Sequence, residues 1–378
     1  MSESKRIYGL DILRAFAILE VLYYHAGHYL TGHPRLSRFY YNLYVDGVTV
    51  FFVLSGFLIG RIILKTLDSK NLSAGNLFDF WIRRWFRTLP NYFLVLIVLF
   101  FLAYIRNIQV IPAWYTYFAF AQNLTSIRSG FNNFFVESWS LCVEEWFYFV
   151  VPLLLFMTIM LLRINVKRAF FIWACFIITL VTIYKLYRTN VLYYTDEIYL
   201  NINIRMVVIT RLDSIMYGCL AAYFSYYKSL FWNRKNFLFY SGIVLLLAIL
   251  LTPGSFRHGY GITVYFTLLP ICIFLLLPKL SSINSGSGFL YKTVTFISIV
   301  SYSLYLVNLS IVREFLMPKI IAYTGLANNN SYLLIGLKCI LFLVISISLA
   351  YLLYKLYEKP MTKMRERFAR DNSVKANL

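Results

Sequence analysis

Ten long apolar stretches constrain the fold of this chain more than any other feature. A helix needs about 20 mostly apolar residues to cross the hydrocarbon core of a bilayer. Such stretches lie near residues 8–30, 44–64, 89–105, 139–162, 169–187, 204–227, 237–251, 260–277, 294–316 and 332–356. Only 14% of the residues are charged, against about 25% in soluble domains. We therefore expect an all-α integral membrane protein with a single domain over residues 1–378, and we exclude soluble, disordered and fibrous classes.

The basic residues are unevenly divided among the connecting segments. Alternate segments, beginning with the N-terminus, hold 21 Lys and Arg residues, whereas the others hold 7. By the positive-inside rule, both termini are predicted to be cytoplasmic, with residues 357–378 as a basic cytoplasmic tail. The net charge of +20 is thus explained by topology and does not indicate nucleic acid. A further stretch, Pro112–Thr125, is too short to cross and rich in Trp and Tyr, so we expect an interfacial or re-entrant helix there.

The first apolar stretch carries an unusual line of polar residues. Arg14 and His25 are eleven residues apart, which places them about 20° from a common helix face and about 16 Å apart along the axis. Asp11 and His28 lie close to the same line. Charged residues within a membrane normally face a polar cavity. This pattern predicts a water-accessible or substrate-filled path across the membrane, with structural pairing or interfacial packing as the alternative.

Two further groups of charged residues accompany this helix. Arg83, Arg84 and Arg87 are interleaved with aromatic residues, before the stretch at 89–105. They are suited either to binding phosphates or to anchoring the chain at anionic lipid headgroups. Glu144 and Glu145 lie about one turn into a later stretch. Because consecutive helix residues point about 100° apart, at most one of the two carboxylates faces a given site. The five cysteines are isolated within apolar stretches, and neither a metal site nor a disulfide is expected.

These elements, taken in order, resemble the acyltransferase-3 family, the multispan bacterial O-acyltransferases that modify surface polysaccharides and related acceptors. The resemblance covers nearly the whole chain. It rests on GLDILRAFAILEVLYYHA with its Arg-x10-His spacing, DGVTVFFVLSGFLIG, RRWFRTLPNY, ESWSLCVEEWFYFVVP, RLDSIMYGCLAA, ISIVSYSLYLVN and the EKP at 358–360.

The resemblance implies transfer of an acyl group, usually acetyl, from cytoplasmic acyl-coenzyme A to a hydroxyl of a saccharide acceptor. The acceptor is expected to be a surface polysaccharide or its lipid-linked precursor, at the bacterial cytoplasmic membrane and among its lipids, with no metal. His25 is expected to act as general base or to relay the acyl group, with Glu145 or Glu144 orienting it. The expected donor-binding residues are Arg14, Arg83, Arg84 and Arg87, and the expected acceptor-binding residues are Asp46, Arg211, Asp213 and Asn308.

The chain also departs from the family pattern. The family often has an acid at the position of Thr49, whereas here the acid is Asp46. Where the family often has His, this chain has Asn308, which can hydrogen-bond but cannot take up a proton at neutral pH. Asn308 is therefore expected to position substrate. Some members carry a fused SGNH-type esterase domain, and here we expect a separate protein for any second transfer step.

Two other functions fit a chain of this composition. A transporter or flippase would account for ten spans with charges inside them, but it predicts repeated halves with broken helices, and the sequence shows no such pairing. A membrane glycosyltransferase predicts an acidic DxD-type motif in a long outer loop, which this chain lacks. Neither function explains why His25 and the arginine cluster occur together.

Overall fold

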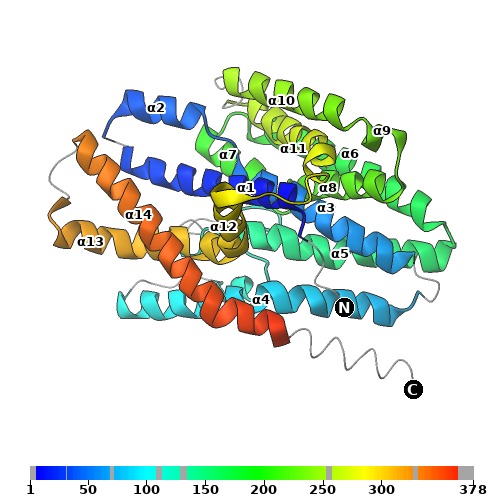
Figure 1. Ribbon diagram of the computed structural model, residues 1–378, viewed down its shortest axis with the longest axis horizontal. Helices are drawn as coiled ribbons and strands as arrows, with labels where there is room; N and C mark the ends of the chain where they lie inside the picture. Colours follow the sequence, from blue (N-terminus) through cyan, green and yellow to red (C-terminus); the bar gives the residue numbers. More distant parts are fainter. Residues whose placement is uncertain are drawn as a thin grey trace.

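The computed structural model describes residues 6–30, 32–68, 72–107, 113–127, 134–252, 258–326 and 331–364. Within these ranges every regular element is a helix. The α-helices are α1 (Tyr8–Ala26), α2 (Pro34–Asn42), α3 (Gly47–Leu67), α4 (Ala74–Ile105), α5 (Ser138–Leu162), α6 (Val166–Leu192), α7 (Glu197–Arg205), α8 (Leu212–Tyr226), α9 (Leu230–Asn233), α10 (Lys235–Leu251), α11 (Tyr260–Leu280), α12 (Gly288–Val307), α13 (Met317–Tyr323) and α14 (Tyr332–Leu353). Most long helices, among them α1, α4 and α5, run along the long axis of the molecule (Figure 1).

Seven of the described helical segments are long and apolar enough to cross a membrane. This confirms a helical, multi-pass membrane protein. The three other predicted stretches correspond to α1, which carries Asp11, Arg14 and Glu20, to α7 and α8 with a break between them, and to the 17-residue α10. The count of ten spans and the cytoplasmic side of the termini stay predictions.

Several helix boundaries differ from the predicted ones. Helix α4 begins at Ala74, not near residue 89, because Ser73 and Asn76 form a capping box at its start, with Ser73 N donating to Asn76 Oδ1 at 2.8 Å. The arginines at 83, 84 and 87 therefore lie within a helix instead of in a segment before one. After α12 the chain continues as a π-helical turn, η5 (Asn308–Leu316), and then as α13.

The C-terminal tail and the predicted interfacial helix also differ from expectation. Helix α14 continues through the π-helical turn η7 (Tyr354–Glu358) and stays helical to Met364, so the first part of the predicted tail is helix. Residues 365–378 lie outside the described residues. Of the predicted interfacial helix, Pro112 also lies outside them, and Trp114–Tyr117 form one 3-10 turn, η2. The residues after that turn are fixed by Asn123, whose Nδ2 donates to the carbonyls of Trp139 and Met206 at 3.0 and 2.6 Å.

Helices α3 and α8 pack against each other very closely. A Cβ atom at Gly56 would lie 1.9 Å from the carbonyl oxygen of Ile215, and one at Gly218 would lie 2.0 Å from that of Val53. Only glycine allows backbones to approach so closely, as is common between membrane helices. This contact fixes the N-terminal ends of α3 and α8 beside each other, and these ends carry Asp46 and Arg211.

Candidate active site

The structure contains two cavities that share part of their walls. One has a volume of about 680 Å³ and is lined by His25, and we call it the histidine cavity. The other has a volume of about 450 Å³ and is lined by Arg14, Arg84 and Arg87, and we call it the arginine cavity. Both volumes are typical of small-molecule sites. Val48 of α3 and Tyr305 of α12 line both cavities, so the two spaces lie back to back.

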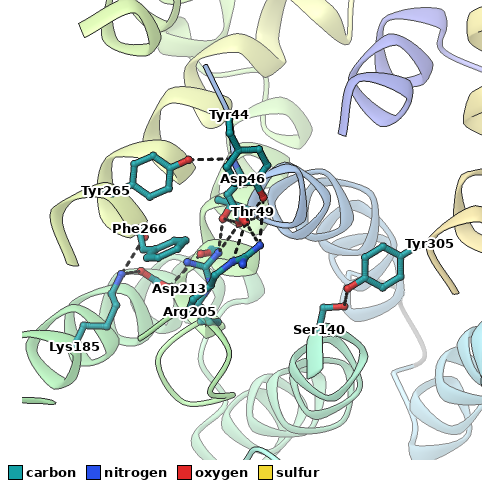
Figure 2. Close-up of polar contacts among 12 residues, drawn as sticks. Tyr44, Asp46, Thr49, Ser140, Lys185, Arg205, Asp213, Tyr265, Phe266 and Tyr305 are labelled. Atoms are coloured by element: carbon teal, nitrogen blue, oxygen red, sulfur yellow. Dashed lines mark hydrogen bonds and ion pairs between the residues drawn. The ribbon is translucent and has the colours of Figure 1, made fainter. Parts of the chain in front are cut away.

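The wall between the cavities is built where α3 and α5 begin and α12 ends. In α5, Trp139 lines the histidine cavity, whereas its neighbour Ser140 lines the arginine cavity. The hydroxyls of Ser140 and Tyr305 are hydrogen-bonded at 2.6 Å, and Tyr305 also donates to the carbonyl of Glu137 at 3.1 Å (Figure 2). Backbone that is not helical is tolerated at membrane depth where it lines a cavity. The non-helical residues before α3 and α5 meet this condition, because they lie at the wall between the two cavities.

In the histidine cavity the partner of His25 is Asn308. The Nδ1 atom of His25 lies 2.5 Å from Asn308 Oδ1, and Asn308 is fully buried at the start of η5. Two residues later, Ser310 donates to Glu137 from its backbone N–H at 3.1 Å and from its hydroxyl at 2.5 Å. Glu137 lines the same cavity and lies just before α5, and burial raises the pKa of its carboxyl to about 7.

The rest of the histidine cavity is aromatic and polar. Its aromatic lining consists of Tyr24, Tyr41, Tyr44, Trp139, Tyr265, Phe266 and Tyr305. Arg205 donates to Asp46 Oδ1 from Nε at 3.1 Å and from Nη2 at 2.8 Å, and its guanidinium lies 5.2 Å from the ring centre of Tyr24. No hydrogen bond from Arg205 Nη1 is present among the described residues. This arrangement leaves one cationic donor of Arg205 available in a cavity lined by rings and hydroxyls.

Asp46 caps α3 and connects the cavity to buried charges behind it. It accepts from the backbone N–H of Thr49 at 2.9 Å and from the Tyr44 hydroxyl at 2.9 Å, and Thr49 also accepts from Arg211 (Figure 2). Arg211 Nη2 lies 3.8 Å from Asp46 Oδ2. The acid at Asp46 thus provides a negative charge next to Thr49, the position at which the family often has an acid.

A second buried ion pair lies beside this cluster. Lys185 Nζ is 2.6 Å from Asp213 Oδ2, both side chains are fully buried, and Lys185 also donates to the carbonyl of Phe266 at 3.1 Å (Figure 2). Of the predicted acceptor-binding residues, Asp46 lines the histidine cavity, and Asn308 lies directly behind His25. Arg211 and Asp213 line neither cavity and contact other buried charges.

The arginine cavity gathers cations from both ends of the chain. They are Arg6, Arg14, Arg84, Arg87, Lys359 and Lys363. Arg84 Nη2 lies 3.1 Å from Glu144 and 2.6 Å from the Tyr148 hydroxyl. Arg14 lies 3.5 Å from Asp11 and 3.4 Å from the hydroxyl of Ser298. Arg83, the third arginine of the motif, is exposed on α4 and does not line this cavity.

The structure brings some of the predicted residues together and separates others. Arg14 and His25 line two cavities with a common wall, as expected of residues on one face of α1. Glu144 lines the arginine cavity beside Arg84, whereas Glu145 is buried and accepts from the Thr88 hydroxyl at 2.9 Å. Neither glutamate is placed against His25, because the side chain of Asn308 occupies that position.

Several charged residues that line the cavities were not predicted to do so, among them Glu137, Arg205, Lys359 and Lys363. Glu137 is the first residue of the ESWSL element, and its position directly before a span was the available signal. Arg205 stands near a span end, where a basic residue is ordinarily explained by snorkelling. Lys359 belongs to the EKP element and Lys363 to the basic tail, and neither was expected to line a cavity. In each case only the tertiary contacts show a cavity-lining side chain.

Known proteins are similar to this chain over more than half of its length. The family model described as an acyltransferase domain matches residues 7–355. The O-acetyltransferase OatA of Staphylococcus aureus (strain NCTC 8325 / PS 47) is 29% identical over 227 residues, which is 57% of this chain and 34% of that protein. The "Putative peptidoglycan O-acetyltransferase YrhL" of Bacillus subtilis (strain 168) is 28% identical over 286 residues, 70% of this chain and 38% of that protein. The chain thus spans about a third of the length of these relatives. No solved structure matches it. From the match over nearly its whole length, the chain belongs to the acyltransferase-3 family.

Proposed function

We propose that this protein is a membrane O-acyltransferase that moves an acyl group, in the usual case acetyl, from cytoplasmic acyl-coenzyme A to a saccharide hydroxyl. The acceptor is a surface polysaccharide or its lipid-linked precursor. One observation carries the proposal: a cationic cavity and an aromatic, histidine-lined cavity lie back to back in one chain. The family and the names of the relatives support acyl transfer to oxygen.

The arginine cavity suits the donor. Its cations outnumber its acids by six to two, and coenzyme A carries three phosphate groups. Arginine binds phosphate oxygens through two parallel N–H donors, so Arg84 and Arg87 are suited to this task. The lining also includes Phe51, Leu54 and Leu58, which suit the less polar pantetheine arm. On this proposal the cavity opens towards the cytoplasm, the side on which the positive-inside rule predicts basic residues.

The histidine cavity suits the acceptor. Its aromatic rings offer flat surfaces for the apolar faces of sugar rings, and its tyrosine hydroxyls offer hydrogen bonds. Two arginines and three acids line it, so it has no strong excess of either sign of charge. A largely uncharged saccharide therefore fits this cavity better than a polyanion does. On this proposal the histidine cavity opens towards the outer side of the membrane.

The chemistry follows from the two ligands meeting at the shared wall. The imidazole of His25 takes the proton of the acceptor hydroxyl, and the hydroxyl oxygen attacks the thioester carbonyl carbon. The carbon–sulfur bond then breaks, the thiolate takes the proton from the imidazolium, and the products are an O-acyl ester and free coenzyme A. Arg205, in the same cavity as His25, can donate to the carbonyl oxygen as negative charge develops on it.

Purified protein in lipid vesicles, given acetyl-coenzyme A with a labelled acetyl group and a panel of candidate glycans, tests this proposal. General-base catalysis contributes about 10² to 10⁴ in rate. We therefore expect His25→Ala to lower transfer about 1,000-fold while acetyl-coenzyme A still binds, since His25 does not line the arginine cavity. A folded His25→Ala protein with normal transfer would falsify the assignment. Movement of glycan across the vesicle without ester formation would favour a flippase instead.

A further inference from the structure

The amide of Asn308 has only one orientation that its surroundings accept. Its Nδ2 atom lies 2.8 Å from the carbonyl oxygen of Leu304 and 2.8 Å from that of Tyr305, so both N–H groups donate to the last turn of α12. Turning the amide over would place its oxygen against two other oxygens in a fully buried site. Such a site does not tolerate unpaired or repelling polar groups. The oxygen of Asn308 therefore faces His25.

This orientation fixes where His25 carries its proton. An amide oxygen only accepts hydrogen bonds, so at 2.5 Å the Nδ1 atom of His25 must donate to it. In a neutral imidazole one ring nitrogen carries the hydrogen and the other has a free lone pair. The free lone pair is then on Nε2. Among the described residues no hydrogen bond engages Nε2, and the ring lines the histidine cavity.

The turn that carries Asn308 is itself held in place from another helix. Glu137, immediately before α5, accepts two hydrogen bonds from Ser310, one from its backbone and one from its hydroxyl. Both residues are buried, and Glu137 lines the same cavity as His25. A π-helical turn such as η5 is uncommon and is often found at functional sites. These contacts keep Asn308 rigid, as a residue that must orient another side chain has to be.

We infer that Asn308 is a positioning residue that holds His25 in the tautomer with hydrogen on Nδ1, so that Nε2 is the base for the acceptor hydroxyl. The inference rests on the proposed function and goes beyond it. When Nε2 takes the proton, the Nδ1–H bond to Asn308 is kept, and the ring does not have to turn. The amide oxygen stabilises the imidazolium through its partial negative charge, without the cost of a full carboxylate charge inside a membrane.

Three variants test this role, all assayed as reconstituted full-length protein. Asn308→Leu has a similar volume and no acceptor, so we expect kcat to fall about 100-fold with the KM for acetyl-coenzyme A unchanged. Asn308→Asp keeps an acceptor oxygen towards Nδ1 but loses the two N–H donors to Leu304 and Tyr305, so only part of kcat is expected to return, in a less stable protein. Asn203→Leu is the matched control, because Asn203 is equally buried, bonds Arg188 at 2.6 Å and lines neither cavity. It is expected to keep the kcat of the wild type.

The pH profile of Asn308→Asp provides a second measurement. A carboxylate beside the imidazole holds its proton more tightly, so the acid limb of kcat should move to higher pH by about one unit or more. The charged groups that face this cavity from other elements, Arg205, Arg313, Asp46, Glu137 and Glu197, are unchanged in the variant.

The outcomes separate this inference from the proposed function. If Asn308→Leu keeps the wild-type kcat while His25→Ala is inactive, the positioning role is overturned and the proposed function stands. If His25→Ala is also fully active, the proposed function fails as well. Should Asn308→Leu fail to fold, an Asn308→Asp protein with the wild-type pH profile would equally overturn the role of Asn308.

Discussion

The two cavities differ in charge more than in size. Six cationic and two acidic side chains line the arginine cavity, whereas two arginines and three acids line the histidine cavity. More aromatic rings line the histidine cavity than the arginine cavity. One cavity is thus suited to a polyanion and the other to a nearly neutral, ring-shaped ligand. Because the same residues, Val48 and Tyr305, line both, the difference indicates two substrates that approach a common wall from opposite sides.

The common wall has to allow passage of only a small group. Acyl transfer needs the thioester carbon within about 3–3.5 Å of the attacking oxygen. His25 lies on one side of the wall, and Arg84 and Arg87 lie on the other. On the proposed function, the end of the pantetheine arm would therefore have to reach past Val48 and the hydrogen-bonded pair of Ser140 and Tyr305. Residues of the wall are expected to decide which acyl groups are transferred.

Among substitutions that test the difference between the two cavities, the largest effect is expected from filling the wall between them. Val48→Phe adds a ring where the cavities meet, so kcat should fall at least about 100-fold, as expected for misplacement of reacting groups. The arginines are not changed, and binding of acetyl-coenzyme A, measured by calorimetry, should stay the same. A folded Val48→Phe protein with unchanged kcat would show that the acyl group does not pass here.

A smaller residue at the same position gives the control. Val48→Ala widens the wall, so the ratio of butyryl to acetyl transfer should rise about 10-fold, in line with 1–3 kcal/mol for one or two methylene groups. An unchanged ratio would place the acyl selectivity elsewhere. Val48→Ala adds no volume to the wall. A loss of kcat that is seen in Val48→Phe and not in Val48→Ala therefore comes from the added ring.

A smaller effect, confined to one cavity, is expected from Arg87→Gln. A hydrogen bond to a charged group contributes about 1.5–3 kcal/mol, so the KM for acetyl-coenzyme A should rise about 10- to 100-fold. The KM for the acceptor should not change, since Arg87 does not line the histidine cavity. Arg83→Gln, on the same helix but outside the cavity, is expected to change the donor KM much less. Equal effects of the two substitutions would mean that the arginines act only through surface charge.

The parts of the structure that depend on local pattern were predictable from the sequence. Nine of the ten apolar stretches lie largely on continuous helical segments, and only 204–227 is interrupted, between α7 and α8. An apolar stretch of about 20 residues is a property of one segment. The Arg14–His25 spacing was equally local, and both residues line cavities. By contrast, the start of α4 depends on a capping box at Ser73, which a search for apolar residues does not detect.

Pairing between distant residues was not predictable in the same way. Asn308 is 283 positions from His25, and Ser310 is 173 positions from Glu137. No periodicity in the sequence relates such distant positions. The sequence therefore favoured Glu144 or Glu145 of α5 as the residue that orients His25, because a carboxylate is chemically suited to that role. Tertiary packing decides which residue contacts His25, in particular the packing of the π-helical turn that begins at Asn308.

The smallest effect on catalysis is expected from the buried ion pair of Lys185 and Asp213, which lines neither cavity. Replacing only Lys185 by Met leaves a buried carboxylate without its partner, and the free energy of unfolding should fall by about 3–5 kcal/mol. Replacing the pair, as Lys185→Met with Asp213→Leu, removes both charges and should recover most of that stability. Unfolding in detergent measures both changes, and kcat and both KM values of the double variant should equal those of the wild type. A raised acceptor KM in a stable double variant would instead show that Asp213 contributes to acceptor binding. Buried charges that do not line the histidine cavity would then also affect how it binds the acceptor.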